Sequence, residues 1–334
     1  MSSSLERKPT TRGDRLCLTF LRHAPQRLVE FVAGALARAK PLAPEPGWYF
    51  DVAANDASPR VRFRRDLWEY YRVRRIERPV TLRWYDGLKV RVFLGNDMSL
   101  CLYVGGSFEP NEFVFLDTFL EPNMTFVDGG ANDGIYSLFA ARRVGSGGTV
   151  LAVEPSTREF ERLEANLDLN PDVHVVPVLA ALGSEAGEAE LAVAEAGHEG
   201  QNTIGSTVSN PKVVTQTHET VRVTTVDALV DERGLARVDV VKLDVEGSEV
   251  DALLGATRTI ERFRPLVQLE AETERLASQG RTKGDLRRVL EGLDYEIFVF
   301  DAHSGTLRSA AAPDEPEGNA IAAPRGWRPP TTRD

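Results

Sequence analysis

Short apolar runs alternate with helical patterns through the last two thirds of this chain. The runs that predict strands lie at residues 125–128, 150–154, 173–179, 238–243, 266–269 and 296–300. Between them, apolar spacing and capping signals predict helices at 109–119, 156–170, 249–263 and 286–293, with Ser156 and Glu159 forming a capping box at the second. Regular alternation of strands and helices is typical of a doubly wound α/β fold with a parallel sheet.

Acidic residues end several of these strands. Residues 125–134 and 240–249 each run from an apolar strand through an acid and glycine into a helix. Glu154 ends the strand between them, about 20 residues beyond the first glycine turn, the offset at which an acid accepts hydrogen bonds from ribose hydroxyls. Because ligands of open parallel sheets bind at the carboxyl ends of the strands, we expect a nucleoside site at this edge.

Asp128 distinguishes between classes of cofactor. A carboxylate at this strand end faces the position where a dinucleotide places its pyrophosphate, and the like charges repel. A cofactor with an ammonium and a sulfonium, as in S-adenosylmethionine, gains from the acid, while its carboxylate meets amides of the turn. The acid therefore favours a cationic cofactor. The alternative enzyme is a Rossmann oxidoreductase that uses NAD. The structural alternative is that Asp128 and Glu154 are ordinary strand-end acids.

The order of motifs resembles FkbM-type methyltransferases over residues 109–300. The matching segments are the turn 128–134, Glu154-Pro155, 180–183 with Gly187, 225–227 and, most specifically, 242–249. The resemblance implies a class I methyltransferase (Rossmann-like) fold and binding of S-adenosylmethionine. It also implies methyl transfer to a hydroxyl of a sugar or natural product.

The resemblance assigns cofactor binding to the strand ends and the glycine turn. Small residues around Ala181 follow the third core strand, where an adenine ring lies flat against backbone and apolar groups. The predicted cofactor-binding residues are Asp128, Gly129, Gly130, Asn132, Gly134, Glu154, Ala181 and Asp244.

The acceptor is assigned to the second motif. Asp244 and Glu246 are the candidate general bases, and Lys242, two residues before Asp244 on the strand, either holds an acid ionised or hydrogen-bonds the acceptor. The alternative is a structural cluster in which these residues and Glu249 form ion pairs and cap the following helix. Glu270 adds a third carboxylate that would suit Mg²⁺ or Ca²⁺, although a metal is not favoured. A non-catalytic binding subunit is the remaining alternative function.

Composition narrows the partners. A formal charge of −10 and no evident basic face disfavour unaided binding to nucleic acid and anionic membranes. The small-molecule acceptor with a hydroxyl is what the resemblance implies. Two cysteines, Cys17 and Cys101, provide neither a disulfide framework nor a metal pattern, so that the cytoplasm is the expected compartment.

The sequence predicts five segments along the chain. They are a disordered N-terminus (1–14), a helical region (15–65), a β cap with a lead-in helix (66–122), a methyltransferase domain (123–309) and a flexible tail (310–334). Within the cap, a hairpin around Asp86-Gly87 and a further strand at 100–104 are expected. The apolar faces of the N-terminal helices predict packing on the domain or on a second subunit, so a homodimer is among the expected assemblies. The polar insert at 194–216 is either an active-site lid or a surface loop.

Overall fold

The computed structural model describes residues 12–39, 58–205, 207–210, 212–301, 304–312 and 315–330. The chain divides into two compact units. The first comprises Met1–Val114 with Ala196–His198, and the second comprises Phe115–Glu195 with Glu199–Asp334. The boundary falls inside helix α6 (Pro110–Phe119), earlier in the chain than the boundary at residue 122 that the sequence predicted.

The first unit contains helices followed by a β-hairpin. Its elements before α6 are α1 (Arg12–His23), α2 (Gln26–Arg38), α4 (Pro59–Arg74), β1 (Arg78–Arg83), η2 (Tyr85–Gly87), β2 (Lys89–Leu94), α5 (Asp97–Ser99) and η3 (Leu100–Gly105). β1 and β2 pair antiparallel around Asp86 and Gly87, which both have positive φ. Helix α4 begins at a proline, and the Ser58 hydroxyl accepts a hydrogen bond from the Val61 amide at 3.4 Å. Serine before a first-turn proline is a strong helix start signal.

Three expectations for this unit are wrong. Residues 12–14 belong to α1 and are not disordered, while residues 1–11 lie outside the described residues. Helix α4 runs through the boundary predicted at residue 65. Residues 100–104 are helical rather than a strand, because Asn96 Oδ1 accepts the Ser99 amide at 2.8 Å and starts a helical turn that continues into the apolar run. A short apolar run alone does not distinguish a strand from a buried helix.

An eight-stranded mixed sheet lies at the centre of the second unit, in the order β13-β12-β14-β11-β10-β3-β4-β5. Its strands are β3 (Thr125–Gly129), β4 (Thr149–Glu154), β5 (Val176–Leu179), β10 (Val240–Leu243), β11 (Leu266–Ala271), β12 (Tyr295–Phe300), β13 (Leu307–Ser309) and β14 (Gly318–Pro324). The five strands from β11 to β5 are parallel. Chain order reverses between β3 and β10, which makes this pair the switch point of the sheet. The predicted doubly wound α/β fold is confirmed.

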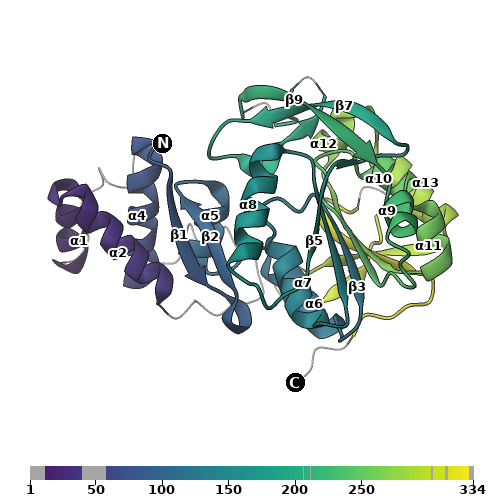
Figure 1. Ribbon diagram of the computed structural model, residues 1–334, viewed down its shortest axis with the longest axis horizontal. Coiled ribbons are helices and arrows are strands. Elements are labelled where there is room, and N and C mark those ends of the chain that lie inside the picture. Colours follow the sequence, from purple (N-terminus) through teal and green to yellow (C-terminus); the bar gives the residue numbers. More distant parts are fainter. Residues whose placement is uncertain are drawn as a thin grey trace. The chain divides into compact units, whose positions relative to one another are not determined.

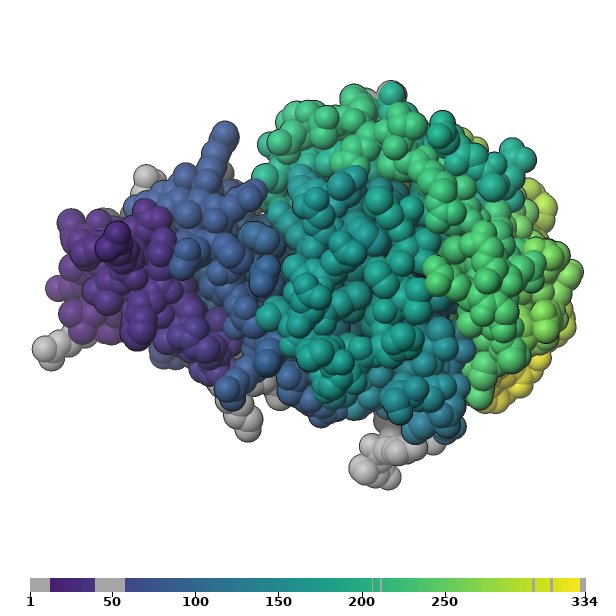
Figure 2. Space-filling model, in the orientation of Figure 1, coloured from purple at the N-terminus to yellow at the C-terminus, as the bar shows by residue number. Residues whose placement is uncertain are grey.

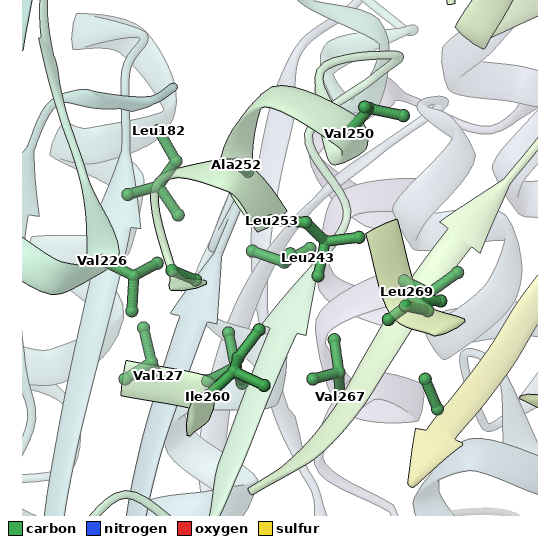
Figure 3. Close-up of a cluster of buried hydrophobic side chains, with 14 of the residues drawn as sticks. Val127, Leu182, Val226, Leu243, Val250, Ala252, Leu253, Ile260, Val267 and Leu269 are labelled. Atoms are coloured by element: carbon green, nitrogen blue, oxygen red, sulfur yellow. The ribbon is translucent and has the colours of Figure 1, made fainter. Parts of the chain in front are cut away.

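Helices cover both faces of the large sheet (Figure 1). α7 (Ile135–Val144) and α8 (Thr157–Asp168) pack on β3, β4 and β5. The opposite face carries α9 (Val226–Glu232), α10 (Glu249–Leu254), α11 (Thr257–Phe263) and α13 (Lys283–Gly292). Figure 3 shows Val127, Leu243 and Val267 of the strands in one cluster with Leu253 and Ile260 of these helices. Strands buried on both faces read as continuous apolar runs, which is why the sequence identified them.

The helix predicted over 249–263 is two helices. α10 ends before Gly255, and α11 starts at Thr257. A Cβ at Gly255 would lie 2.1 Å from the carbonyl oxygen of Gly183, so only glycine permits this approach of the two segments.

The segment 310–334, expected to be a flexible tail, contains a strand of the large sheet, β14 (Gly318–Pro324). Within it, β14 inserts antiparallel between β11 and β12, and residues 320–323 are fully buried. Little of the yellow C-terminal segment reaches the face drawn in Figure 2. Alanine and proline are the most frequent residues of this segment, and its short run of small apolar residues gives a weak strand signal.

A second sheet has the order β6-β9-β7-β8. Its strands are β6 (Ala181–Leu182), β7 (Gly187–Ala194), β8 (Thr203–Ile204) and β9 (Thr215–Thr224). The insert at 194–216 therefore contains β8 and the short helix η4 (Glu199–Gln201), and Gln279 Nε2 donates to the Ile204 carbonyl at 2.7 Å. Its role as a lid stays a prediction. Among the described residues, no helix combines the length and apolar content needed to cross a membrane.

The capping box predicted at the start of α8 is wrong. The Ser156 side chain makes no cap hydrogen bond. Glu159 instead accepts hydrogen bonds from Arg158 at 2.6 Å and from Asn202 at 2.8 Å. These two partly exposed side chains hold the buried Glu159 carboxylate away from the helix start, so that it connects α8 with the insert.

Candidate functional site

The switch point brings the predicted acids to one edge of the sheet. β3 lies between β4 and β10, with Asp128 in register with Lys242 on one side and Ala152 on the other. Glu154 ends β4, and Asp244 follows the last residue of β10. Strands in this parallel arrangement deliver their carboxyl ends to the same edge, as the sequence predicted.

The glycine turn after β3 has no room for side chains at its key positions. Gly130 has φ +72°, and a Cβ there would lie 1.8 Å from the Asp244 carbonyl oxygen. Gly134 has φ +83°, and its Cβ would lie 2.4 Å from Leu163 Cδ1. A Cβ at Gly129 would likewise lie 2.6 Å from Leu182 Cδ1. The turn is therefore pressed against β10 on one side and against α8 on the other.

Asp128 and Lys242 form a buried ion pair beneath this turn. Lys242 Nζ lies 3.1 Å from Asp128 Oδ1, and the two side chains are 3% and 0% exposed. Ser137 of α7 donates to the other Asp128 oxygen at 2.6 Å. Lys242 also donates to the Gly130 carbonyl at 3.2 Å and lies 4.8 Å from the centre of the Tyr136 ring. Both charged groups thus hold the turn in place from below, and Asp128 offers no exposed surface to a ligand.

Asp244 is the accessible acid of the second motif. Its side chain is 29% exposed, and its Oδ2 lies 3.5 Å from Lys242 Nζ. Lys242 therefore contacts both Asp128 and Asp244 and links these two acids.

Glu154 supports the glycine turn from the neighbouring strand. Its carboxylate accepts hydrogen bonds from the amides of Asn132 at 2.8 Å and Ser156 at 2.9 Å. Asn132 has φ +48°, and its own side chain accepts the Asp133 amide at 2.7 Å. Burial raises the pKa of Glu154 to about 8, with Glu159 adding to the rise and the two amides opposing it. Each carboxylate oxygen retains a lone pair that suits a ribose hydroxyl.

Glu246 is held by an arginine that the sequence analysis did not single out. Glu246 has φ +54°, an uncommon conformation for a residue with a side chain. Its carboxylate contacts Arg275 of α12 (Thr273–Ser278), which also contacts Glu270 at 2.6 Å and Glu272 at 2.7 Å. Burial raises the pKa of Glu246 well above its ordinary value, Arg275 opposes this, and Asp244 adds to it.

Glu249 has a structural position. Its Oε1 accepts hydrogen bonds from the amides of Val245 at 3.0 Å and Gly247 at 3.2 Å, which closes the loop between β10 and α10. Burial raises the pKa of Glu249 to about 7, against the effect of these amides. For this residue the geometry fits the structural alternative, in which it caps the loop and contacts no ligand.

Ala181 lies away from the ion pairs. It belongs to β6, pairs with Val223 of β9 and is buried. It lines a cavity of about 280 Å³ together with Gly183, Ser248 and Gln279. Small residues such as Ala186 and Gly187 also line this cavity, and adenine binding by Ala181 stays a prediction.

Sequence reasoning missed several residues that complete the site. Tyr136 and Ser137 directly follow the glycine turn, and their place in the first helical turn was an available signal. Gln268 of β11 donates to the Tyr136 hydroxyl at 3.0 Å, and Arg275 lies five residues beyond Glu270. Neither of the last two belongs to a motif, so only the packing of β11 and α12 identifies them.

The chain matches a known family over the same strands and turns. The model of the methyltransferase FkbM domain matches residues 128–297, slightly more than half of the chain. The chain belongs to the FkbM methyltransferase family. Family membership confirms the resemblance and, with the fold, the class I α/β architecture. Methyl transfer is the function of this family, so the alternative of an NAD-dependent oxidoreductase is set aside.

The chain is also similar to a curated enzyme and to several solved structures. The hexuronic acid methyltransferase AglP of Haloferax volcanii is 25% identical over 176 residues, which cover 51% of this chain and 68% of that protein. The FkbM methyltransferase of Methylobacillus flagellatus is 17% identical, with a TM-score of 0.40, over 82% of this chain and 57% of that one. This chain thus spans little more than half the length of that protein. A SAM-dependent O-methyltransferase of Thermotoga maritima is 15% identical, with a TM-score of 0.36, over 74% and 78% of the two chains.

Proposed function

We propose that the protein is an S-adenosylmethionine-dependent O-methyltransferase that acts on a hydroxyl of a small molecule, either a sugar or a natural product. The observation that carries this proposal is the arrangement of Glu154 and Asp244 on either side of the glycine turn, within a domain of the FkbM family. The accessible acid and the turn share the edge of the sheet where ligands of this architecture bind.

The residues present fit this cofactor. Gly130 and Gly134 have positive φ and no room for a Cβ, so they give the turn a shape that residues with side chains rarely adopt. Glu154, fixed by two amides, is placed for the ribose hydroxyls, and Asp244 gives the edge a negative charge that suits a cationic cofactor. Asp128 acts through Lys242 and the turn rather than by contact with the cofactor.

Asp244 is the best placed candidate for the general base. The cofactor supplies a methyl group on a positively charged sulfur and with it most of the activation. Positioning of the acceptor contributes about 7–11 kcal/mol, and a general base adds roughly 10²–10⁴ in rate. Asp244 is partly exposed and faces Lys242, whereas Glu246 is paired with Arg275. Of the two acids, Asp244 is therefore the one that reaches an acceptor hydroxyl.

The charge of the site favours an acceptor without a carboxylate. Asp244, Glu246, Glu270 and Glu272 lie near the guanidinium of Arg275, and Lys242 is a second cation next to Asp244 that also pairs with Asp128. An anionic acceptor such as a hexuronic acid would add a further negative charge, which costs free energy in a partly buried site. We therefore place a neutral sugar or polyketide-type hydroxyl first among the acceptors, although the curated relative is named for a hexuronic acid.

Calorimetry tests the cofactor directly. Titration of the full chain with S-adenosylhomocysteine at neutral pH should show binding, whereas NADH should show none. A folded protein that binds neither S-adenosylmethionine nor S-adenosylhomocysteine contradicts the proposal.

Asp244→Asn tests the base. It should lower the rate of methyl transfer by roughly 10²–10⁴ while leaving cofactor binding measurable. Asp168→Asn, an exposed acid at the end of α8, is the matched control and should keep full activity. Full biological activity of the double variant with Asp244→Asn and Glu246→Gln would instead support the non-catalytic subunit.

A further inference from the structure

Arg275 lies in the middle of a group of carboxylates at the carboxyl edge of the sheet. Carboxylate oxygens of Asp244, Glu246 and Glu270 all lie within 4.8 Å of one another. Three oxygens at such spacing form the usual partial ligand set of Mg²⁺ or Ca²⁺. In this protein Arg275 contacts two of the three carboxylates, Glu246 and, at 2.6 Å, Glu270, while the charge of Asp244 acts on the guanidinium without a direct contact.

Contacts of its side chain and of its backbone carbonyl hold Arg275 in place. Its Nε lies 2.7 Å from Glu272 Oε2, which is contributed by the residue just before α12. Its carbonyl oxygen accepts the Ser278 hydroxyl at 2.6 Å. The side chain is only 21% exposed, so the guanidinium has little freedom to leave the cluster.

The second motif accommodates the backbone of Arg275. Gly247 has φ +105°, and a Cβ there would lie 2.5 Å from the Arg275 carbonyl oxygen. This glycine therefore allows α12 to approach the loop that carries Asp244 and Glu246. The strained φ of Glu246, the residue before it, turns that carboxylate toward the arginine. Two independent features of the loop, the glycine and the strained glutamate, thus serve one contact.

We propose that Arg275 takes the place of a divalent cation among Asp244, Glu246 and Glu270, so that it is the positioning residue of a metal-independent acceptor site. The catalytic part of this inference rests on the proposed function, whereas the contacts of Arg275 with the carboxylates do not depend on it. The guanidinium neutralises Glu246 and Glu270 and fixes their orientation, as a bound ion would, through charge-assisted contacts.

Removal of the arginine should convert the cluster into a metal site. Arg275→Gln leaves Glu246 and Glu270 without their cation, while Lys242 stays next to Asp244, and the repulsion among the carboxylates is relieved when a divalent ion binds. We expect this variant to bind Mn²⁺ with a dissociation constant of about 10⁻⁴–10⁻³ M, the weak end of the range for carboxylate sites. The wild type should bind at this place at least about tenfold more weakly, because the guanidinium repels the ion.

Electron paramagnetic resonance of Mn²⁺ gives a readout that does not depend on activity. The series consists of the wild type, Arg275→Gln, Arg275→Lys, and Arg275→Gln combined with Asp244→Asn. Arg288→Gln removes a largely exposed arginine of α13 and is the matched control. Bound Mn²⁺ should be found in Arg275→Gln alone, be lost in the double variant, and stay absent in Arg275→Lys, which keeps the positive charge.

Two results overturn the inference. One is Mn²⁺ bound to the wild type at a site that Asp244→Asn removes, which tests the idea even if Arg275→Gln does not fold. The other is a folded Arg275→Gln that binds no more Mn²⁺ than the Arg288→Gln control.

Methyl transfer by the wild type should also persist in EDTA. Calorimetry with S-adenosylhomocysteine separates the two proposals, since absence of cofactor binding would remove the proposed function and leave the Mn²⁺ result unchanged.

Discussion

Lys242 Nζ lies 3.1 Å from Asp128 Oδ1, and neither side chain is appreciably exposed. The pair joins β10 to β3 at the switch point, and the lysine also donates to the carbonyl of Gly130. A buried ion pair connected in this way fixes the glycine turn relative to the second motif. The two motifs thus form one unit whose charges are balanced within the protein.

Loss of Lys242 should destabilise the fold. Lys242→Met leaves Asp128 buried without its cation, and we expect the free energy of unfolding to fall by about 3–5 kcal/mol. Urea denaturation measures this. The double variant Lys242→Met with Asp128→Leu removes both charges and should regain much of the loss, because an apolar pair of similar volume is tolerated where a lone charge is not. A single variant as stable as the wild type would show that the pair carries no structural role.

Glu154 should make stability depend on pH. Burial raises its pKa to about 8 from the ordinary value of 4.5, so the folded state keeps the proton where the unfolded state has released it. Stability from this group is therefore complete below about pH 4.5 and is lost as the pH rises toward 8, with a slope of at most about 1.4 kcal/mol per pH unit.

Comparison of variants isolates that slope. Glu154→Gln should flatten the pH dependence of the urea midpoint between pH 5 and 8, even though the amide of Gln lowers stability by accepting fewer hydrogen bonds. Burial also raises the pKa of Asp133 and of Glu249 to about 7. These two groups add pH slopes of the same sign, so only the difference in slope between Glu154→Gln and the wild type is informative. Glu164→Gln, an exposed acid on α8, is the control. Equal slopes in both variants would contradict the assignment.

Gly130→Ala should disrupt the turn. The residue has φ +72°, which costs a residue with a side chain about 1–2 kcal/mol, and the new methyl would meet the Asp244 carbonyl. We expect lower stability together with weaker binding of S-adenosylhomocysteine by calorimetry. Gly292→Ala, at the end of α13 with open space around it, should instead be neutral or stabilising. Unchanged cofactor binding in Gly130→Ala would remove the turn from the site.

Asn202 should hold the insert against α8. Its side chain donates to Glu159 at 2.8 Å and accepts the Ala194 amide at 2.9 Å. Asn202→Ala removes a hydrogen-bond donor from the buried Glu159 carboxylate, and we expect the free energy of unfolding to fall by about 1–3 kcal/mol. Hydrogen exchange of the Ala194 amide should become faster by a factor that matches this loss. Asn210→Ala, in the same insert, should leave that amide unchanged; an equal effect of both variants would point to general loosening of the insert.

The sequence identified the core strands and the acids at their ends. The strands of the sheet centre are buried on both faces, so that their residues are apolar without interruption and end at polar positions. For that reason Asp128, Glu154 and Asp244 were predicted at the same edge, and β3, β4 and β10 are adjacent in the structure. Their individual roles in binding and catalysis stay predictions.

The sequence by itself determined the alternation of strands and helices, the glycine turn and the family, because these depend on periodicity and on residues close together in the chain. Only the tertiary structure decided that β14 enters the sheet, that Lys242 neutralises Asp128, and that Arg275 joins Glu246 to Glu270. These contacts link segments that lie far apart in the chain or outside any motif. Their free energy comes from burial and charge pairing, which exist only when the packed strands bring those segments together.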